Sequence, residues 1–384
     1  MIPVRYNIGS LWNRKVGTLM TILGIGLTVS IFVAMMALVY GLDATFVETG
    51  HDYDLVVVRQ GGLNEVNSFF NRSLFQTVRF LPGVARGSNG VPLACGEIVV
   101  VIAVTRKTGD SSNVLVRGTS ELGISMRPEA KLVRGRWLQP GLREIVVSTS
   151  LANRFQDMNV GDSLAFGRSP WTVVGVFDAG GTAYDSEIWA NYNEIAQEWE
   201  RHIYSSILVR AENEAAATDI IRRIADDERI KLQAIPQKKY YADQTSTSVG
   251  VKALGYFIAV VMGIGAGFAA MNMMYGAVMS RAGEVATLRA LGFQRRSILA
   301  SFLLESLIVS ALGGVVGCLL ALPVNGISTG TANFQSFSEV LFNFRITPQI
   351  LAEGILFALV VGVLGGYLPA RRASKVKLAD VMKE

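Results

Sequence analysis

Long runs without charge divide the chain. No Asp, Glu, Lys or Arg occurs in residues 16–42 or in residues 253–280. A third apolar run, residues 298–322, contains Glu305 as its one charged residue, and a fourth run covers residues 354–370. A helix needs about 20 apolar residues to cross the bilayer core, with a lower limit of about 17. The pattern therefore predicts four membrane-spanning helices.

Three of these runs contain pairs of glycines four residues apart. This spacing lets helix backbones approach closely inside a bilayer. Glycine is also common in membrane helices generally, so the pattern predicts close packing without saying which helices pair. The pairs are Gly263 and Gly267, Gly313 and Gly317, and Gly362 and Gly366.

The first run follows the basic residues Arg5, Arg14 and Lys15, as a secretory signal peptide would. The apolar part of a signal peptide is about 7–15 residues long and ends at a cleavage site with small residues. Residues 16–42 are longer and lack such an end, so we expect this span to remain in the protein. Before it, Val4, Ile8, Leu11 and Trp12 recur at helical spacing, which predicts an interfacial amphipathic helix.

The segment between the first two runs, residues 43–252, is far longer than a connecting loop and has the size of one or two domains. Short β-branched runs separated by Gly, Pro, Asn and Asp predict strands. Residues 215–227 place isoleucines at helical spacing. We therefore predict a membrane protein with four transmembrane α-helices and a large α+β extracytoplasmic domain inserted between the first and second.

Composition agrees with this assignment, since 50% of residues are hydrophobic and 17% are charged. The net charge of +5 comes from 36 Lys and Arg against 31 Asp and Glu. Basic residues concentrate before the first span, between spans two and three, and after span four. By the positive-inside rule these three segments face the cytoplasm. The net charge is thus a sign of topology, and we expect no nucleic-acid partner.

The predicted organisation follows from these observations. Its segments are an N-terminal interfacial helix (1–15), transmembrane helix 1 (16–42), the extracytoplasmic domain (43–252), transmembrane helix 2 (253–280), a cytoplasmic loop (281–297), transmembrane helix 3 (298–322), an extracytoplasmic connection (323–353), transmembrane helix 4 (354–370) and a basic cytoplasmic tail (371–384).

Catalytic motifs are few. A phosphate-binding loop would need a Gly-Lys pair, which the sequence lacks. Residues 326–330 match Gly-x-Ser-x-Gly, the pattern of a hydrolase nucleophile elbow, but an elbow needs a strand before it, a helix after it and a His partner. The chain has two histidines, His51 and His202. We favour a flexible polar loop leaving the third span, and a hydrolase using Ser328 remains an alternative.

Metal and disulfide sites are not predicted. Cys95 and Cys318 cannot build a disulfide framework, and Cys-x2-Cys and His-x3-His spacings are absent from the sequence. The scattered carboxylates of residues 43–252 are interpreted as a solvated surface. Glu305 inside the third span would need a partner if buried, and snorkelling toward the cytoplasm is the simpler interpretation.

Residues 281–293 predict a short amphipathic helix in the loop between spans two and three. Arg281 and Glu284 can pair at i,i+3, and glycines punctuate both ends. A merely solvated loop would not require Leu288, Leu291 and Phe293 beside its charges. A docking surface is therefore favoured.

At this point the chain resembles a known family. The run Gly-Glu-Val-Ala-Thr-Leu-Arg-Ala-Leu-Gly, then a basic pair, Phe-Leu-Leu-Glu-Ser and Gly-Gly-Val-Val-Gly, is similar to FtsX/MacB-type permeases of ABC transporters, of the type VII superfamily. Near the end, Pro-Ala-Arg-Arg-Ala is similar to the same family's C-terminal pattern. The order of one span, a large outer domain and three spans also fits.

The resemblance implies that the predicted short helix is a coupling helix that seats on a cytoplasmic ABC ATPase. ATP and Mg would be bound by that partner, with no cofactor, metal or catalytic residue in this chain. Because the sequence starts directly at its membrane segment, we expect a separate ATPase subunit, as in the lipoprotein-releasing and heterocyst-envelope exporters. The implied coupling residues are Arg281, Glu284, Val285, Leu288, Arg289, Leu291, Gly292 and Phe293.

The family resemblance also implies partners and a function. A second permease copy or paralogue would complete a dimer in the bacterial inner membrane, with both termini cytoplasmic. In cells with two membranes, a periplasmic adaptor and an outer-membrane channel would follow. ATP hydrolysis would drive movement of the outer domain and so export or extract a substrate. The alternative is an FtsX-like signal transmitter that activates a cell-wall hydrolase without transport.

Overall fold

The computed structural model describes residues 15–374 apart from 63, 201–202, 245 and 334–335. The predicted interfacial helix, except for Lys15, and most of the basic tail lie outside the described residues. The chain divides into two compact units. The membrane unit comprises residues 15–40, 250–327 and 344–374 of the described chain, and the inserted domain comprises residues 41–249 and 328–343.

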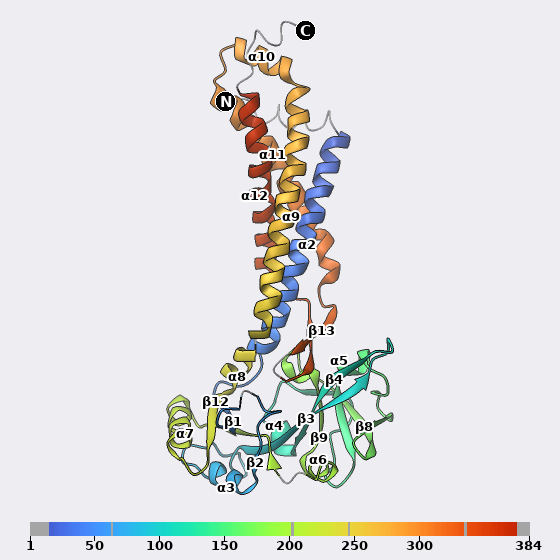
Figure 1. Ribbon diagram of the computed structural model, residues 1–384, viewed down its shortest axis with the longest axis vertical. Coiled ribbons are helices and arrows are strands. Elements are labelled where there is room, and N and C mark those ends of the chain that lie inside the picture. Colours follow the sequence, from blue (N-terminus) through green and yellow to red (C-terminus); the bar gives the residue numbers. More distant parts are fainter. Residues whose placement is uncertain (1–14, 63, 201–202, 245, 334–335, 375–384) are drawn as a thin grey trace. The chain divides into compact units, whose positions relative to one another are not determined.

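Four helices of the described chain are long and apolar enough to cross a membrane, as predicted. In the membrane unit they lie side by side (Figure 1). The bilayer core has no water to satisfy backbone N–H and C=O groups, so apolar runs of this length form helices, which bond internally. They are α2 (Lys15–Val47), α9 (Ser246–Met279), α11 (Arg295–Ala321) and α12 (Pro348–Ala373), with α10 (Ala282–Ala290) between α9 and α11 and a short 3-10 turn, η2 (Leu322–Val324), after α11.

Glycines set the distance between helices in the membrane unit. A methyl group at Gly317 of α11 would lie 2.5 Å from the carbonyl oxygen of Gly26 on α2, and one at Gly366 of α12 would lie 2.6 Å from Ser306 Oγ on α11. Gly267 differs, because a methyl group there would meet no atom within 4 Å. The glycine spacing therefore marks the contacts of α11 with α2 and α12, whereas the position of a side chain at Gly267 is open.

The inserted domain is built on a ten-stranded mixed sheet with the order β12-β1-β11-β3-β4-β9-β6-β8-β5, and β7 pairs with β8. Neighbours are antiparallel except for the parallel pairs β4/β9 and β6/β8. A separate two-stranded sheet pairs β2 (Phe70–Asn71) with β10 (Ile203–Tyr204). The strands of the large sheet are β1 (Asp54–Arg59), β3 (Ala94–Thr105), β4 (Ser111–Thr119), β5 (Lys131–Gly135), β6 (Glu144–Ser148), β7 (Ser163–Phe166), β8 (Ser169–Asp178), β9 (Glu187–Asn191), β11 (Ser206–Arg210) and β12 (Leu232–Pro236).

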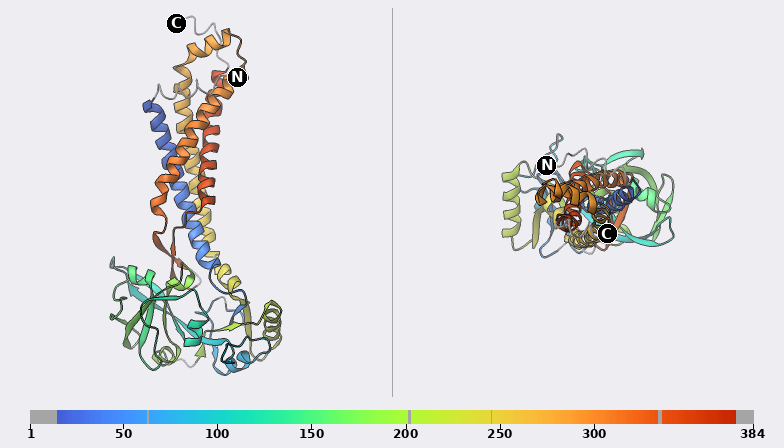
Figure 2. Two further views of the ribbon diagram at one scale, coloured as in Figure 1. Left: turned by 180° about the vertical axis from the view of Figure 1, so that it is seen from behind. Right: turned by 90° about the horizontal axis from the view of Figure 1, so that it is seen from above.

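Short helices pack on this sheet, and polar caps fix where several of them start. The side chains of Ser120, Ser148, Asn191 and Asn213 each accept a hydrogen bond from a backbone N–H in the first turn. Figure 2 shows these elements from two further directions. The helices are α3 (Ser73–Arg79), α4 (Glu121–Ser125), α5 (Thr149–Arg154), α6 (Tyr192–Glu198), α7 (Glu214–Asp226) and α8 (Gln237–Gln244), with the 3-10 turn η1 (Ala183–Ser186).

The connection between α11 and α12 is more ordered than the sequence suggested. We expected a flexible polar loop at residues 326–330, but β13 (Ser328–Asn333) and β14 (Ser338–Asn343) form an antiparallel hairpin. This hairpin belongs to the inserted domain, where the side chain of Leu341 enters the core. The prediction of a flexible loop was wrong because alternating small and polar residues, which carry little hydrophobic signal, pair with the more apolar β14.

Candidate functional site

The short helix predicted between the second and third spans is present as α10. Glu284 lies in its first turn and Arg289 in its last, the arrangement that the helix dipole favours. At its end Gly292 N donates to Arg289 O at 3.1 Å and Phe293 N donates to Leu288 O at 3.1 Å. These two bonds form a Schellman motif, which requires the left-handed backbone that Gly292 adopts at φ +90. Gly292 is therefore needed to end the helix.

One face of α10 packs against the membrane helices. Val285 is 3% exposed and lies in an apolar cluster with Val278 of α9 and Ile298 and Phe302 of α11. We expected Val285 to belong to a docking surface, but the structure places it in the protein's own core. Val285 therefore acts as an anchor for α10 on the membrane helices.

The other residues of the predicted set differ in exposure. Leu291 is 72% exposed, and the Glu284 side chain is 56% exposed. Leu288, Arg289 and Phe293 are half-buried, and Gly292 is exposed. A partner protein could therefore reach an exposed leucine and an exposed carboxylate at opposite ends of α10.

Arg281 joins α10 to α11 through two carboxylates. Its Nε donates to Glu284 Oε2 at 3.1 Å, which confirms the predicted i,i+3 pair. Its Nη1 donates to Glu305 Oε2 at 3.0 Å. The Glu305 side chain is 5% exposed, so the prediction that it snorkels toward water was wrong. A buried carboxylate is stabilised by a paired guanidinium, and Arg281 supplies that pair.

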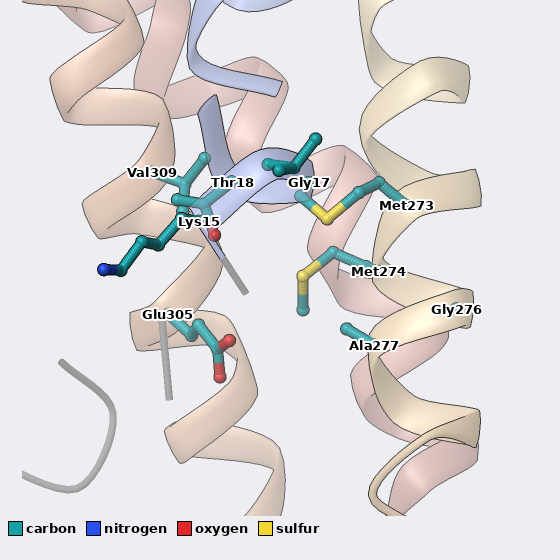
Figure 3. A pocket seen from close by; sticks show the side chains of 10 residues that line it. Lys15, Gly17, Thr18, Met273, Met274, Gly276, Ala277, Glu305 and Val309 are labelled. Atoms are coloured by element: carbon teal, nitrogen blue, oxygen red, sulfur yellow. The ribbon is translucent and has the colours of Figure 1, made fainter. Parts of the chain in front are cut away.

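Glu305 also borders a cavity of about 650 Å³ in the membrane unit (Figure 3). Residues of three helices line it: Lys15, Gly17 and Thr18 of α2, Met273, Met274 and Ala277 of α9, and Glu305 and Val309 of α11. In Figure 3 the Met273 and Met274 thioethers point toward this space. The walls are therefore mainly apolar.

A buried ion network lies within the inserted domain. The guanidinium of Arg117 donates to Glu65, Glu97 and Glu187 over 2.7–2.9 Å, and Arg127 donates to Glu97 from two nitrogens at 2.7 Å. Their side chains are at most 7% exposed. These carboxylates were expected on a solvated surface, and that prediction was wrong for all three. They come from a loop and two strands that meet only in the folded sheet.

The network lowers the pKa of Glu97, the most buried of its three carboxyls. Burial alone would raise the pKa of Glu97, but Arg127 and Arg117 outweigh it and lower the pKa to about 2. Burial raises the pKa of Tyr184 to about 12, although Arg127 lies 5.2 Å from the centre of its ring. Each carboxylate oxygen of Glu97 accepts from an arginine, so the network is an ionised structural element.

A second set of ion pairs holds the β13–β14 hairpin to the rest of the inserted domain. Glu339, whose side chain is 3% exposed, accepts from Arg106 at 2.7 Å and from Arg154 at 3.0 Å. Ser328 begins strand β13, and its hydroxyl donates to Asn343 Oδ1 at 2.6 Å. This strand position lacks the strand-to-turn-to-helix context of a nucleophile elbow, so the hydrolase alternative loses its structural basis.

Two family models cover most of the chain. The MacB-like periplasmic core domain matches residues 18–227, and the FtsX-like permease C-terminal domain matches residues 256–378. The chain belongs to the MacB/FtsX-like family of ABC transporter permeases. The four spans and the inserted α/β domain of this permease fit that family, as the sequence resemblance implied.

Curated relatives align over much of the permease. The macrolide export ATP-binding/permease protein MacB of Brucella abortus (strain 2308) is 25% identical over 391 residues, covering 94% of this chain and 56% of the relative. The protein of the same name from Rhodopseudomonas palustris (strain HaA2) is 26% identical, covering 72% of this chain and 44% of the relative. The chain thus spans about half the length of these relatives.

Two solved structures are also similar to this permease. The periplasmic region of MacB from Actinobacillus actinomycetemcomitans is 12% identical with a TM-score of 0.37, covering 52% of this chain and 92% of that one. The extracellular domain of the noncanonic ABC-type transporter YknZ from Gram-positive bacteria is 15% identical with a TM-score of 0.36, covering 47% of this chain and 99% of that one.

The sequence pattern did not predict the ion pairs of Arg117 or those of Glu339. The available signal was the position of single charges within or beside apolar strands, as in Glu-Ile-Val-Val-Val from Glu97 and Val-Leu-Val-Arg at Arg117. A charge in a strand of this kind is buried when both faces of the sheet are covered. The partner of each charge, however, depends on strand order, which the local pattern does not contain.

Proposed function

We propose that this permease couples ATP hydrolysis by a cytoplasmic ABC ATPase subunit to movement of the inserted domain, and so drives export or extraction of a substrate. ATP and Mg would be bound by the ATPase subunit. The observation that carries the proposal is the construction of α10. Its Val285 face is anchored in the membrane unit, while Leu291 and Glu284 remain exposed for a partner.

The proposed orientation rests on charge. Exposed Arg295 and Arg296 at the start of α11, and Arg371 and Arg372 at the end of α12, follow the positive-inside rule if α10 faces the cytoplasm. Both termini are then cytoplasmic, and the inserted domain lies outside. A second permease copy or paralogue, and in cells with two membranes an adaptor and an outer-membrane channel, would complete the assembly.

The docking role is tested with the cognate ATPase in liposomes. We expect Leu291→Ala and Glu284→Lys to weaken ATPase binding by about tenfold, because each removes or reverses an exposed contact of a protein interface. Leu288→Pro should also abolish coupling, since proline breaks a helix interior. Glu212→Lys, which reverses an exposed charge of the inserted domain, is the matched control and should bind normally.

Normal ATPase binding and stimulation in all three α10 variants would overturn the docking assignment. The alternative function, activation of a cell-wall hydrolase without transport, shares the docking step. It is favoured over export if the coupled complex stimulates hydrolysis of purified peptidoglycan but moves no substrate across or out of the liposome membrane.

A further inference from the structure

A buried ion pair links the start of α10 to the interior of α11. The Arg281 and Glu305 side chains are 10% and 5% exposed, and the bond between them is 3.0 Å long. The Arg281 Cζ atom also lies 5.4 Å from the centre of the Phe302 ring, which sits one turn before Glu305 on α11. The guanidinium is therefore held by two neighbouring positions of α11.

The same guanidinium is shared with an exposed carboxylate. Glu284, on α10, lies 3.1 Å from Arg281 Nε and is 56% exposed. An exposed ion pair contributes little free energy, because water solvates both charges when they separate. A buried pair differs, because removing one partner leaves an uncompensated charge in a medium of low dielectric constant. A protein that binds Glu284 can therefore draw it from Arg281 while the pair with Glu305 persists.

The position of Arg281 in the chain allows this pair to connect the movements of α10 and α11. Arg281 lies between the end of α9 at Met279 and the start of α10 at Ala282. Val285, one turn further on, lies in one apolar cluster with Ile298 and Phe302 of α11. The first half of α10 is thus fixed to α11 by one ionic and one apolar contact, whereas its end at Leu291 is exposed.

We infer that Glu305 is a positioning residue for the docking helix: through Arg281 it fixes the start of α10 to α11, so that a force applied to α10 moves α11. This inference rests on the proposed docking function of α10. It assigns a role in coupling to a carboxylate that lies within the membrane-spanning segment.

The positioning itself is tested without the ATPase, by hydrogen exchange of the full chain in lipid nanodiscs. We expect Glu305→Gln to speed exchange of the α10 amides by about tenfold, because local opening no longer breaks a charged hydrogen bond. Glu284→Gln, the matched control on the exposed side of the same guanidinium, should change that exchange by less than about twofold. Equal exchange in Glu305→Gln and the unmodified protein would overturn the inference.

The charge-swapped double variant Arg281→Glu with Glu305→Arg covers the case in which Glu305→Gln does not fold. Made together with Glu284→Gln, so that no carboxylate at position 281 faces Glu284, it restores the pair with reversed polarity, and α10 should recover its protection. A folded charge-swapped variant whose α10 stays unprotected would also overturn the inference. That result would show that restoring the ion pair is not enough to fix α10.

A second experiment distinguishes failure of this inference from failure of the proposed function. With the cognate ATPase, Glu305→Gln should bind with unchanged affinity but lose most of the stimulated ATP turnover. If no α10 variant alters ATPase binding, the docking function fails while the exchange result still decides whether Glu305 positions α10. If Glu305→Gln binds normally and retains full stimulation, the pair does not transmit force and the inference fails alone.

Discussion

The Arg117 side chain is only 2% exposed within the inserted domain. It is buried among three carboxylates, so its removal leaves Glu65 and Glu187 without their guanidinium, whereas Glu97 retains Arg127. We expect Arg117→Met to lower the free energy of unfolding by about 3–5 kcal/mol. Urea unfolding followed by tryptophan fluorescence measures this, since Trp189 donates to Glu187 within the network.

The matched control for that substitution is Arg168→Met. Arg168 pairs with Glu200 on the surface, where the two side chains are 66% and 69% exposed. Loss of an exposed pair should change the free energy of unfolding very little, because water solvates both charges. Similar losses for the two variants would contradict the view that burial makes the Arg117 network structurally important.

The same network predicts a response to acid. The pKa of Glu97 falls to about 2 in the folded domain from 4.5, because Arg127 and Arg117 outweigh the burial that would raise it. A depressed folded pKa stabilises the fold above the unfolded value, and that stabilisation is lost as pH falls from about 4.5 toward about 2. We expect the melting temperature of the domain to drop steeply over this range.

Glu97→Gln provides the comparison for the acid response. The variant should be less stable at pH 7, and its melting temperature should fall less between pH 5 and pH 3 than that of the unmodified protein. Parallel pH profiles for the two proteins would assign the acid sensitivity to other carboxylates.

At the scale of elements, the β13–β14 hairpin is the part of the inserted domain that the chain forms between α11 and α12. Glu339 secures it through Arg106 and Arg154. We expect Glu339→Gln to destabilise the hairpin by about 1–3 kcal/mol, the cost of leaving buried polar groups poorly paired. Hydrogen exchange of residues 328–343 should then be faster, while Glu200→Gln should leave it unchanged.

The contact between α2 and α11 depends on a residue without a side chain. A methyl group at Gly317 would lie 2.5 Å from Gly26 O and 2.6 Å from the Val29 Cβ atom. We expect Gly317→Ala to force the two helices apart and cost about 1–3 kcal/mol, as overpacking does in protein cores. Thermal unfolding in detergent measures this, and Gly267→Ala, which meets no atom within 4 Å, should be tolerated.

At the scale of the whole molecule, the orientation across the membrane remains a prediction from charge. Cys95 and Cys318 are buried, so introduced cysteines can report topology with little background. We expect Ser111→Cys in the inserted domain to react with an impermeant maleimide in intact spheroplasts, and Gly283→Cys in α10 to react only after permeabilisation. The reverse pattern would invert the topology and exclude a cytoplasmic ATPase at α10.

Much of this architecture could be read from local patterns. The four spans follow from apolar runs, because a bilayer accepts only segments that satisfy their own backbone hydrogen bonds. The position of α10 follows from a short charged and apolar segment between two spans, and the Schellman motif at its end follows from Gly292. The pairing of Arg281 with Glu284 needs only the spacing of a helix.

Contacts between distant residues could not be read in this way. Arg117 meets Glu187 because β4 pairs with β9, and Glu305 meets Arg281 because α11 packs against the start of α10. The burial of Val285 and the ion pair between Glu339 and Arg106 depend on the same kind of packing. The physical reason is that hydrophobic periodicity and helix formation act over neighbouring residues, whereas strand order and the burial of charge arise only when separate elements share one core.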